Sequence, residues 1–185
     1  MLCVFHVFQT VGYYGFGTLV PLVLAAKGFS VLSSLTYTTI AFLGYPAGSA
    51  LSIFIVDRID RRWLIVATAF FMAVFGVALG LSNAPVAIGI LGILYTLTSN
   101  IFSNALHIFQ GEIFPTSTRA RATGFAYSLS RASSAVAPFI LLPVLRDFGP
   151  VAMFATIAIA MLIVMIDIAL FAPTTTGRTL EQIAA

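Results

Sequence analysis

Six apolar segments follow one another along the chain, and short polar joins separate them. They cover residues 2–26, 33–56, 63–82, 85–109, 122–145 and 150–172. A helix needs about 20 residues to cross a hydrocarbon core of roughly 30 Å, and each segment reaches that length. The pattern predicts an all-α membrane protein with six transmembrane helices in one domain, residues 1–172. Residues 173–185 are expected to form a cytoplasmic tail.

The six segments differ in polarity in a repeating order. The third and sixth are almost pure hydrocarbon, whereas the other four carry amide, hydroxyl and aromatic side chains. Two triplets in the order polar, polar, apolar are typical of a 3+3 inverted repeat, the arrangement that transporter halves use. We expect the two apolar helices to face lipid and the four polar helices to line a cavity.

Glycine and proline lie inside these segments at positions that affect helix packing. Two pairs have the GxxxG spacing that allows close helix approach: Gly44 with Gly48, and Gly76 with Gly80. Pro46 and Pro138 lie inside the second and fifth segments, where each removes a backbone donor and bends the helix. For each proline, a packing kink and a gating hinge are both compatible with the sequence.

Composition supports placement in a lipid bilayer. Of the 185 residues, 60% are hydrophobic and only 8% are charged, and the mean hydropathy is +1.06. Soluble domains carry roughly 25% charged residues, so this chain has too few to cover a water-soluble fold. The net charge of +3 comes from a few basic residues at segment ends and does not indicate a nucleic-acid partner. The single cysteine, Cys3, excludes an intrachain disulfide, and no spacing typical of metal ligands occurs, so we expect no metal and no cofactor.

The positions of lysine and arginine predict the orientation. With the N-terminus inside the cell, the inner loops hold six basic residues: Arg58, Arg61, Arg62, Arg119, Arg121 and Arg178. The outer loops hold only Lys27 and Arg146. By the positive-inside rule this bias predicts an integral protein of the plasma or inner membrane with both termini cytoplasmic.

One positive charge lies deep in the fifth segment. Arg131 follows Ala122 by nine residues, which is roughly 13 Å of helix at about 1.5 Å per residue. A charge at that depth is expensive and usually faces a polar pathway. A guanidinium fits a carboxylate, and Tyr127 lies one turn earlier on the same face. We predict that Arg131 and Tyr127 bind an anionic substrate; a structural pair between Arg131 and Asp167 is the alternative.

Other polar side chains recur at helical spacing, so that several of them lie on the same helix face and can contact one ligand together. Asn100, Asn104 and His107 occur at i, i+4 and i+7, and Gln9 and Tyr13 at i and i+4. We predict that both asparagines, Gln9 and Tyr13 contact substrate. Hydrogen bonds between helices are the alternative for the asparagines, and aromatic packing is the alternative for Tyr13.

Three titratable side chains within the segments are candidates for proton coupling. They are His6, His107 and Asp167. Histidine changes its charge near neutral pH, and an aspartate inside an apolar segment is unusual enough to suggest a role. The alternatives are packing for each histidine and pairing with Arg131 for Asp167.

Four motifs occur in an order that resembles a known family. DRIDRR at 57–62, EIFPT at 112–116 with Arg119 and Gly124, and PTTTGRTLE at 173–181 resemble the major facilitator superfamily. The closest resemblance is to the C-terminal six helices of its sugar-porter-like and metabolite:proton symporter branches. YYGFGT at 13–18 followed by KGFS at 27–30 is similar to the seventh helix of nicotinate-transporter-like members. The resemblance covers essentially the whole chain.

The chain departs from the family pattern in two motifs and in length. Asp60 stands where the loop motif usually has glycine, and Thr174 and Thr176 replace charged residues in the last motif. The family has twelve helices, so the resemblance implies that an N-terminal six-helix half, or a second copy of the chain, supplies the other wall of the cavity.

The resemblance implies roles for several charged residues. An arginine at the place of Arg131 contacts anionic substrates in the organic-anion branch. A charge network closes the cytoplasmic ends of the helices, and the residues that match it are Asp57, Arg58, Arg61, Arg62, Glu112, Arg119 and Arg121. Making and breaking such ion pairs would shift an equilibrium between two conformations, so we predict a cytoplasmic gate here.

The predicted function is therefore secondary active transport, by the chain or by the carrier of which it is half. The solute is expected to be a small organic anion, moved by alternating access and coupled to protons. A truncated or regulatory membrane protein without transport is one alternative, and a carrier of sugars or other neutral metabolites is another. We predict no enzymatic activity, because no GlySerGly-type turn supplies an intramembrane protease nucleophile.

Overall fold

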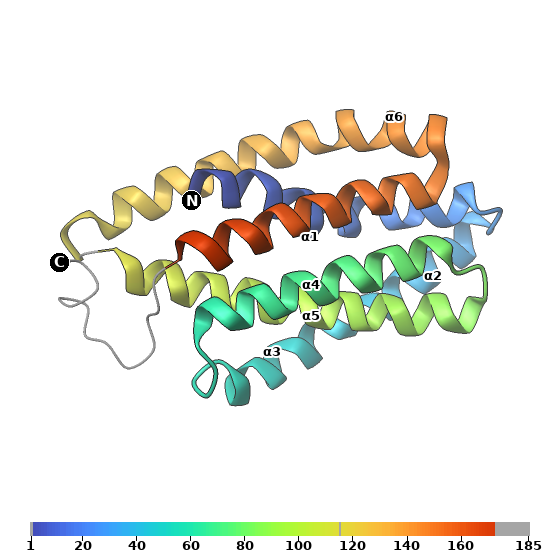
Figure 1. Cartoon of the computed structure of the whole chain (residues 1–185). Coiled ribbons are helices and arrows are strands. Elements are labelled where there is room, and N and C mark those ends of the chain that lie inside the picture. The colour runs from blue at the N-terminus through green and yellow to red at the C-terminus, as the bar shows by residue number, and fades with distance from the viewer. Residues whose placement is uncertain (1, 115, 173–185) are drawn as a thin grey trace.

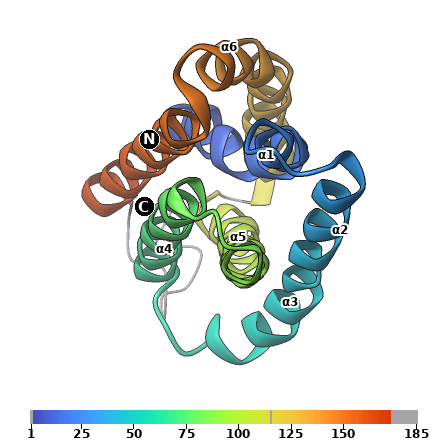
Figure 2. The ribbon, with the colours of Figure 1, turned by 90° about the vertical axis from the view of Figure 1, so that its right-hand side faces the viewer.

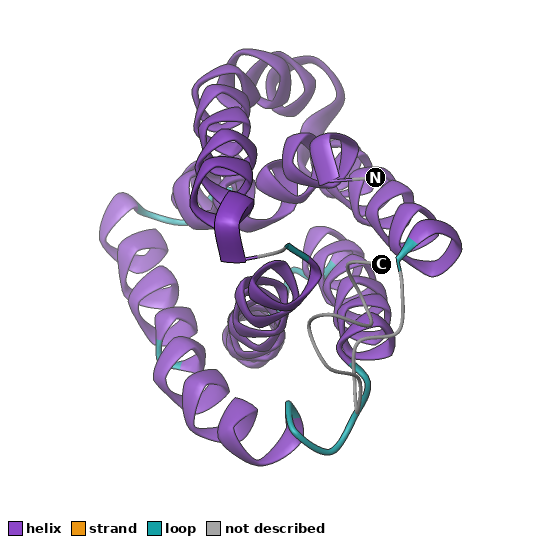
Figure 3. Ribbon diagram, turned by 90° about the vertical axis from the view of Figure 1, so that its left-hand side faces the viewer, coloured by secondary structure: helices purple, strands orange, loops and turns teal. Residues whose placement is uncertain are grey.

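Long helices running nearly side by side make up the chain in the computed structural model, which describes residues 2–114 and 116–172 (Figure 1). They are α1 (Leu2–Ala26), α2 (Val31–Phe42), α3 (Gly44–Ile55), α4 (Arg61–Leu81), α5 (Pro85–Ile113) and α6 (Thr116–Phe171). Figure 3 shows only helices and loops over these described residues. The predicted tail at 173–185, with its motif, lies outside them.

The predicted second segment consists of two helices, α2 and α3. They meet at Leu43, and Pro46 lacks the amide hydrogen that would bond the carbonyl of Phe42 four residues earlier. The GxxxG pair begins at this break, with Gly44 as the first residue of α3. The break is therefore a local consequence of the proline, placed where the chain also has its smallest side chains.

The fifth and sixth predicted segments are joined within α6. Its backbone leaves helical geometry at Gly149, where φ is +83° and ψ is −179°. Glycine adopts this left-handed φ without a side-chain clash, and Pro150 suits the first position of the next helix. The two legs of α6, residues 116–148 and 150–171, lie side by side and run in opposite directions (Figure 1).

Among the described residues, five helical stretches are long and apolar enough to cross a membrane. The longest of them is α6, and it folds back at Gly149. The predicted all-α membrane fold is confirmed. A count of six crossings depends on taking the two legs of α6 separately, and the inverted relation between the two triplets stays a prediction.

The core lies where α1, α4, α5 and the second leg of α6 meet. The rings of Phe16 and Tyr95 stack with centroids 3.9 Å apart, and Phe154 packs beside Phe16. The Tyr95 hydroxyl donates to the carbonyl of Gly12 at 2.9 Å, which ties α5 to α1. Viewed along the bundle, α2 and α3 flank α5 on its other side (Figure 2).

The two apolar segments, α4 and the second leg of α6, pack against each other and turn large side chains outward. These exposed side chains are Phe70, Phe71, Val74, Ile159, Leu162 and Ile166. Exposed surface of this kind suits contact with lipid acyl chains. Large apolar side chains are also exposed on α2, α3 and the first leg of α6, among them Leu32, Ile53 and Phe139, so the expectation that two helices face lipid and four line a cavity stays a prediction.

Lys27, just after α1, caps the end of α4. Its ammonium donates to the carbonyls of Leu79 at 2.9 Å and Gly80 at 2.7 Å, and also to that of Ser82. The last carbonyls of a helix have no partner within the helix, and a cation there also interacts favourably with the helix dipole. The contact joins two elements that are more than fifty residues apart in sequence.

We expect Lys27→Met to lower the free energy of unfolding by about 1–3 kcal/mol, because hydrogen bonds from a charged donor are lost while the carbonyls stay partly buried. Thermal unfolding of the purified chain in detergent measures the change. Arg146→Met is the matched control, since Arg146 is an exposed basic residue at the same end of the bundle. Equal unfolding temperatures for the two variants would show that the cap contributes nothing.

Candidate functional site

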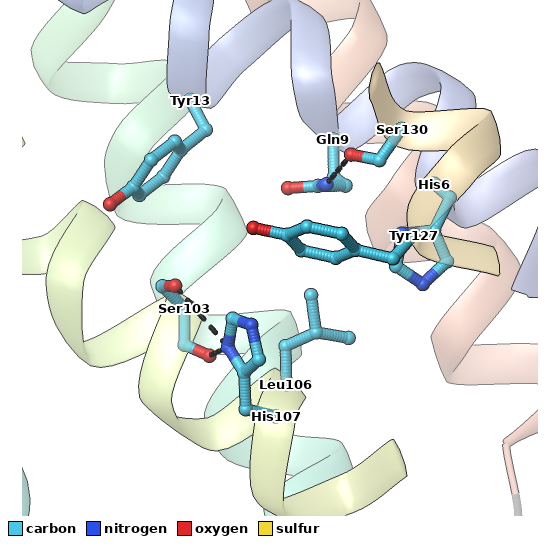
Figure 4. A pocket seen from close by; sticks show the side chains of 8 residues that line it. All are labelled: His6, Gln9, Tyr13, Ser103, Leu106, His107, Tyr127 and Ser130. Carbon is cyan, nitrogen blue, oxygen red and sulfur yellow. Dashed lines mark hydrogen bonds between the residues drawn. The ribbon is translucent and has the colours of Figure 1, made fainter. Parts of the chain in front are cut away.

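Polar side chains from three helices converge on a pocket between α1, α5 and the first leg of α6 (Figure 4). Its volume is about 190 Å³. The residues that line it are His6, Gln9, Tyr13, Ser103, Leu106, His107, Tyr127 and Ser130. Five of these eight are residues that the sequence predicts for substrate contact or proton coupling.

Helical periodicity explains why each helix presents several side chains to this pocket. The three residues from α1 occur at i, i+3 and i+7. Ser103 and His107 are four apart on α5, and Tyr127 and Ser130 are three apart on α6. Residues at these spacings share one helix face, so the rotation of each helix aims its whole set at the pocket.

A buried hydrogen-bond network joins α1 to α6 beside the pocket. Gln9 Nε2 donates to Ser130 Oγ at 2.9 Å, and the hydroxyls of Thr10 and Ser130 lie 2.7 Å apart. The Thr10 hydroxyl also lies 2.7 Å from the carbonyl of His6, to which it donates. Thr10 and Ser130 are absent from the sequence-based site, because isolated hydroxyl residues in apolar helices commonly bond their own backbone.

The pocket contains two imidazoles in different surroundings. His6 is 1% exposed, and its Nε2 contacts the side-chain amide of Gln110 on α5. His107 is exposed, and its Nδ1 donates to the carbonyl of Ser103 at 2.6 Å. In Figure 4 the Tyr127 ring extends across the pocket between Gln9 and His107. The structure thus brings the two predicted histidines to one site.

Arg131 lies behind the pocket wall. Its guanidinium carbon is 4.7 Å from the centroid of the Tyr127 ring, and Nη2 donates to the Tyr127 hydroxyl. One residue of helix separates Arg131 from Ser130 by about 100°, which directs Arg131 to the exposed flank of α6. The guanidinium therefore borders the pocket through the tyrosine.

The predicted asparagines lie outside the pocket, on the side of α5 that faces α3. The Ser49 hydroxyl donates to Asn100 Oδ1 at 2.8 Å, and Asn104 Nδ2 donates to Ser52 Oγ at 2.8 Å. Asn104 also lines a neighbouring recess of about 340 Å³ that reaches Asp57. In this conformation both asparagines serve as hydrogen-bonding links between helices, which is the alternative that the sequence left open.

A charged cluster closes the end of the bundle where α4 begins and α5 ends. Arg61 lies 3.2 Å from a carboxylate oxygen of Glu112 and 3.3 Å from one of Asp57. Arg62 donates to the carbonyl of Ala169 near the end of α6. The other three arginines of the predicted gate take less central positions: Arg119 donates to the carbonyl of Phe114 at 3.3 Å, and Arg58 and Arg121 are exposed.

Asp167 is the one proton-coupling candidate outside the pocket. It lies on the second leg of α6 and is 7% exposed. Within residues 2–114 and 116–172, no three His, Cys, Asp or Glu side chains gather as a metal ion would need. The groups available in the pocket are neutral hydrogen-bonding side chains, two imidazoles and aromatic rings.

Comparison with known proteins gives concordant results. The family model described as Major Facilitator Superfamily matches residues 2–184. The chain is 23% identical to "Inner membrane metabolite transport protein YdjE" of Escherichia coli (strain K12), with 95% of this chain and 39% of the relative covered. It is 26% identical to "Niacin transporter NiaP" of Acinetobacter baylyi, with 92% and 39% covered.

Solved structures share the helical arrangement. The proton:xylose symporter XylE matches with a TM-score of 0.79 and 22% identity over 98% of this chain. A peptide transporter POT in complex with sulfate matches with a TM-score of 0.81 and 14% identity over 95% of this chain. The chain spans 41% of the first structure and 38% of the second, so it corresponds to less than half of each.

Proposed function

Because the chain belongs to the Major Facilitator Superfamily, we propose that it forms one half of a secondary transporter for a small organic anion. The chain is an integral membrane protein, and its named relatives are transport proteins. The observation that carries the proposal is the pocket between α1, α5 and α6, where polar and aromatic side chains converge beside Arg131. We propose no reaction chemistry at this site.

The size and lining of the pocket suit a compact acid. A cavity of about 150 Å³ can hold benzene, so a pocket of about 190 Å³ has room for a single ring or a short chain. Tyr13 and Tyr127 offer aromatic faces and Gln9 offers an amide, while Arg131 places a positive charge behind Tyr127, one side chain away from a carboxylate in the pocket. Relatives named as niacin and cis,cis-muconate transport proteins support an anionic solute.

A second six-helix unit completes the cavity in this proposal. Polar side chains on α2 and α3 are exposed, among them Thr36, Thr39 and Ser49. A separate half or a second copy of the chain would cover these groups. The two units would then rock about the site, as parallel-related halves can.

The charged cluster at Arg61 serves as the inner gate in this proposal. Glu112 at the end of α5 pairs with Arg61 at the start of α4, and Asp57, just before α4, pairs locally with the same guanidinium. Breaking the ion pair between Arg61 and Glu112 would release these two helix ends and favour an inward-open state. Both termini would lie in the cytoplasm, and His6, His107 or Asp167 would carry the coupled proton.

Uptake into proteoliposomes tests the proposal. The chain is reconstituted alone or with a co-expressed N-terminal six-helix unit, and radiolabelled nicotinate is supplied outside with an inward proton gradient. We expect saturable uptake that a protonophore abolishes and that cis,cis-muconate, but not xylose, inhibits. Uptake equal to that of empty liposomes under both conditions, or inhibition by xylose alone, would contradict transport of an organic anion.

A further inference from the structure

An apolar cavity lies between α1 and the two legs of α6, behind the wall that carries the polar pocket. Its volume is about 180 Å³, and α1 lines it with Phe8 and Val11. At about 100° per residue, these two side chains lie on the opposite side of α1 from His6, Gln9 and Tyr13. The thickness of α1 therefore separates this cavity from the polar pocket.

Small side chains on both legs of α6 leave this space open. Ala137 on the first leg and Ala160 on the second line the cavity and are buried. The helix α1 already touches the second leg at Gly12, where an added methyl group would lie 2.5 Å from the Met161 side chain. It cannot move closer to fill the space, so the cavity follows from the packing of the helices.

The chemistry of the lining favours a hydrocarbon ligand. Among the described residues around the cavity, only Thr156 has a polar atom in its side chain, and its hydroxyl donates to the carbonyl of Ala152 at 2.9 Å. A cavity of about 150 Å³ with an apolar lining stays dry and can bind benzene. A cavity of about 180 Å³ of the same character therefore suits a hydrocarbon group of several carbon atoms.

The cavity opens to the outside of the bundle between the two legs of α6. Ile140 on the first leg and Ile159 on the second both line it, and they are 55% and 58% exposed. Ile159 also belongs to the exposed apolar surface of α4 and the second leg described above. The mouth of the cavity is thus continuous with a surface suited to acyl chains, which are the solvent of a membrane-spanning bundle.

The depth of the cavity identifies which part of a lipid it meets. The turn at Gly149, beside the charged Arg146 and Asp147, marks one edge of the membrane. Ile140 and Ile159 are nine and ten residues from Gly149, which is about 14–15 Å of helix. A hydrocarbon core of roughly 30 Å has its centre at that depth, where acyl chains end. We propose that the cavity binds the methyl end of a phospholipid acyl chain, which enters between the legs of α6 and fills the space behind α1.

A photoreactive lipid tests this proposal on the whole chain in nanodiscs. The probe is a phosphatidylcholine with a diazirine on the last carbon of one acyl chain, and mass spectrometry locates its adducts after illumination. We expect adducts on Phe8 and Val11. Phe70 and Phe71 on α4 are exposed, so their adducts serve as the internal reference. A diazirine beside the ester group should instead mark Phe148 at the turn and leave Phe8 unmarked, because it stays near the membrane edge.

Filling the cavity gives the decisive comparison. Ala160→Leu replaces a methyl group with an isobutyl group at a lining position that is 5% exposed. It should lower the adducts on Phe8 and Val11 about fivefold or more relative to those on α4, because the new side chain occupies the space. Ala67→Leu makes the same change on the exposed face of α4 and should leave these adducts unchanged. Equal adducts in Ala160→Leu and the wild type would mean that the chain lies only on the surface, which overturns the proposal.

The wild type alone also decides the question if Ala160→Leu does not fold. Adducts confined to Phe70 and Phe71 would show that no lipid chain enters the cavity. Equal marking of Phe8 by the two probes would show that the chain end has no preference for the cavity. Either result overturns the proposal.

Discussion

Replacing Gly44 by alanine is expected to lower the free energy of unfolding by about 3 kcal/mol or more, and so to prevent stable packing of α3 on α5. A methyl group on Gly44 would overlap the hydroxyl of Thr96 and the carbonyl of Ile93, and it would lie 2.8 Å from the amide nitrogen of Leu97. Two of these three are backbone atoms of α5. They cannot move aside without distorting that helix, so the cost exceeds that of an ordinary overpacked core.

The same contact holds the break between α2 and α3 in place. The Thr96 hydroxyl donates to the carbonyl of Ala41, one of the last carbonyls of α2. Gly48, one turn beyond Gly44, also leaves no room, since a methyl there would lie 2.5 Å from the Leu97 carbonyl oxygen. Replacing Gly44 would therefore separate α3 from α5 and, at the same time, break the hydrogen bond from the Thr96 hydroxyl to the Ala41 carbonyl.

Thermal unfolding and the yield of monodisperse protein measure the effect of Gly44→Ala. Gly89→Ala on α5 is the matched control, because a methyl group there meets no atom within 4 Å. We expect Gly89→Ala to unfold near the wild-type temperature or slightly above it, since alanine favours a helix over glycine. Equal unfolding temperatures for the two variants would contradict the close contact between α3 and α5 at Gly44.

Removing the guanidinium of Arg131 is expected to reduce the initial rate of nicotinate uptake about 10- to 100-fold, because a positive charge one side chain away from a bound carboxylate contributes on the order of 1.5–3 kcal/mol at an effective dielectric constant of about 20. Arg131→Ala also frees the Tyr127 ring, on which the guanidinium stacks at 4.7 Å. Arg131→Lys keeps the charge but loses the planar fork, so part of the rate should return. Uptake is measured in proteoliposomes below saturation, beside the unfolding temperature of each variant.

The unfolding temperature separates the two roles considered for Arg131. A binding residue leaves stability nearly unchanged when it is replaced, whereas breaking a structural pair with Asp167 would destabilise the bundle. Arg146→Ala is the control, since Arg146 is an exposed arginine on the same leg of α6. Wild-type uptake in Arg131→Ala would exclude the guanidinium from recognition. Loss of uptake together with a marked loss of stability would favour the pair.

The helical membrane fold could be predicted because it depends on short-range properties. The length of an apolar run decides whether it can cross a bilayer, and the identity of Gly149 and Pro150 decides where α6 reverses. The motif at 57–62 likewise placed a charged cluster at one end of the bundle, although Arg61 proved to be its centre. Each of these inferences needs only residues that are neighbours in sequence.

The pocket depends on contacts between distant parts of the chain. Gln9 meets Ser130 across 121 positions, and His6 meets Gln110 across 104. Helical period shows which side chains share a face, but not which neighbour that face meets. The rotation of each helix is decided by packing at places such as Gly44 and by the stacking of Phe16 on Tyr95.

The sequence alone therefore determined the helices, their approximate ends and the family, because hydrophobic length and local motifs are properties of contiguous residues. Only the tertiary structure decided that Asn100 and Asn104 bond to α3 and that Arg131 lies behind Tyr127. A rotation of one residue turns a side chain by about 100°, enough to move it from a pocket to a helix interface. That rotation follows from the fit of all the helices at once.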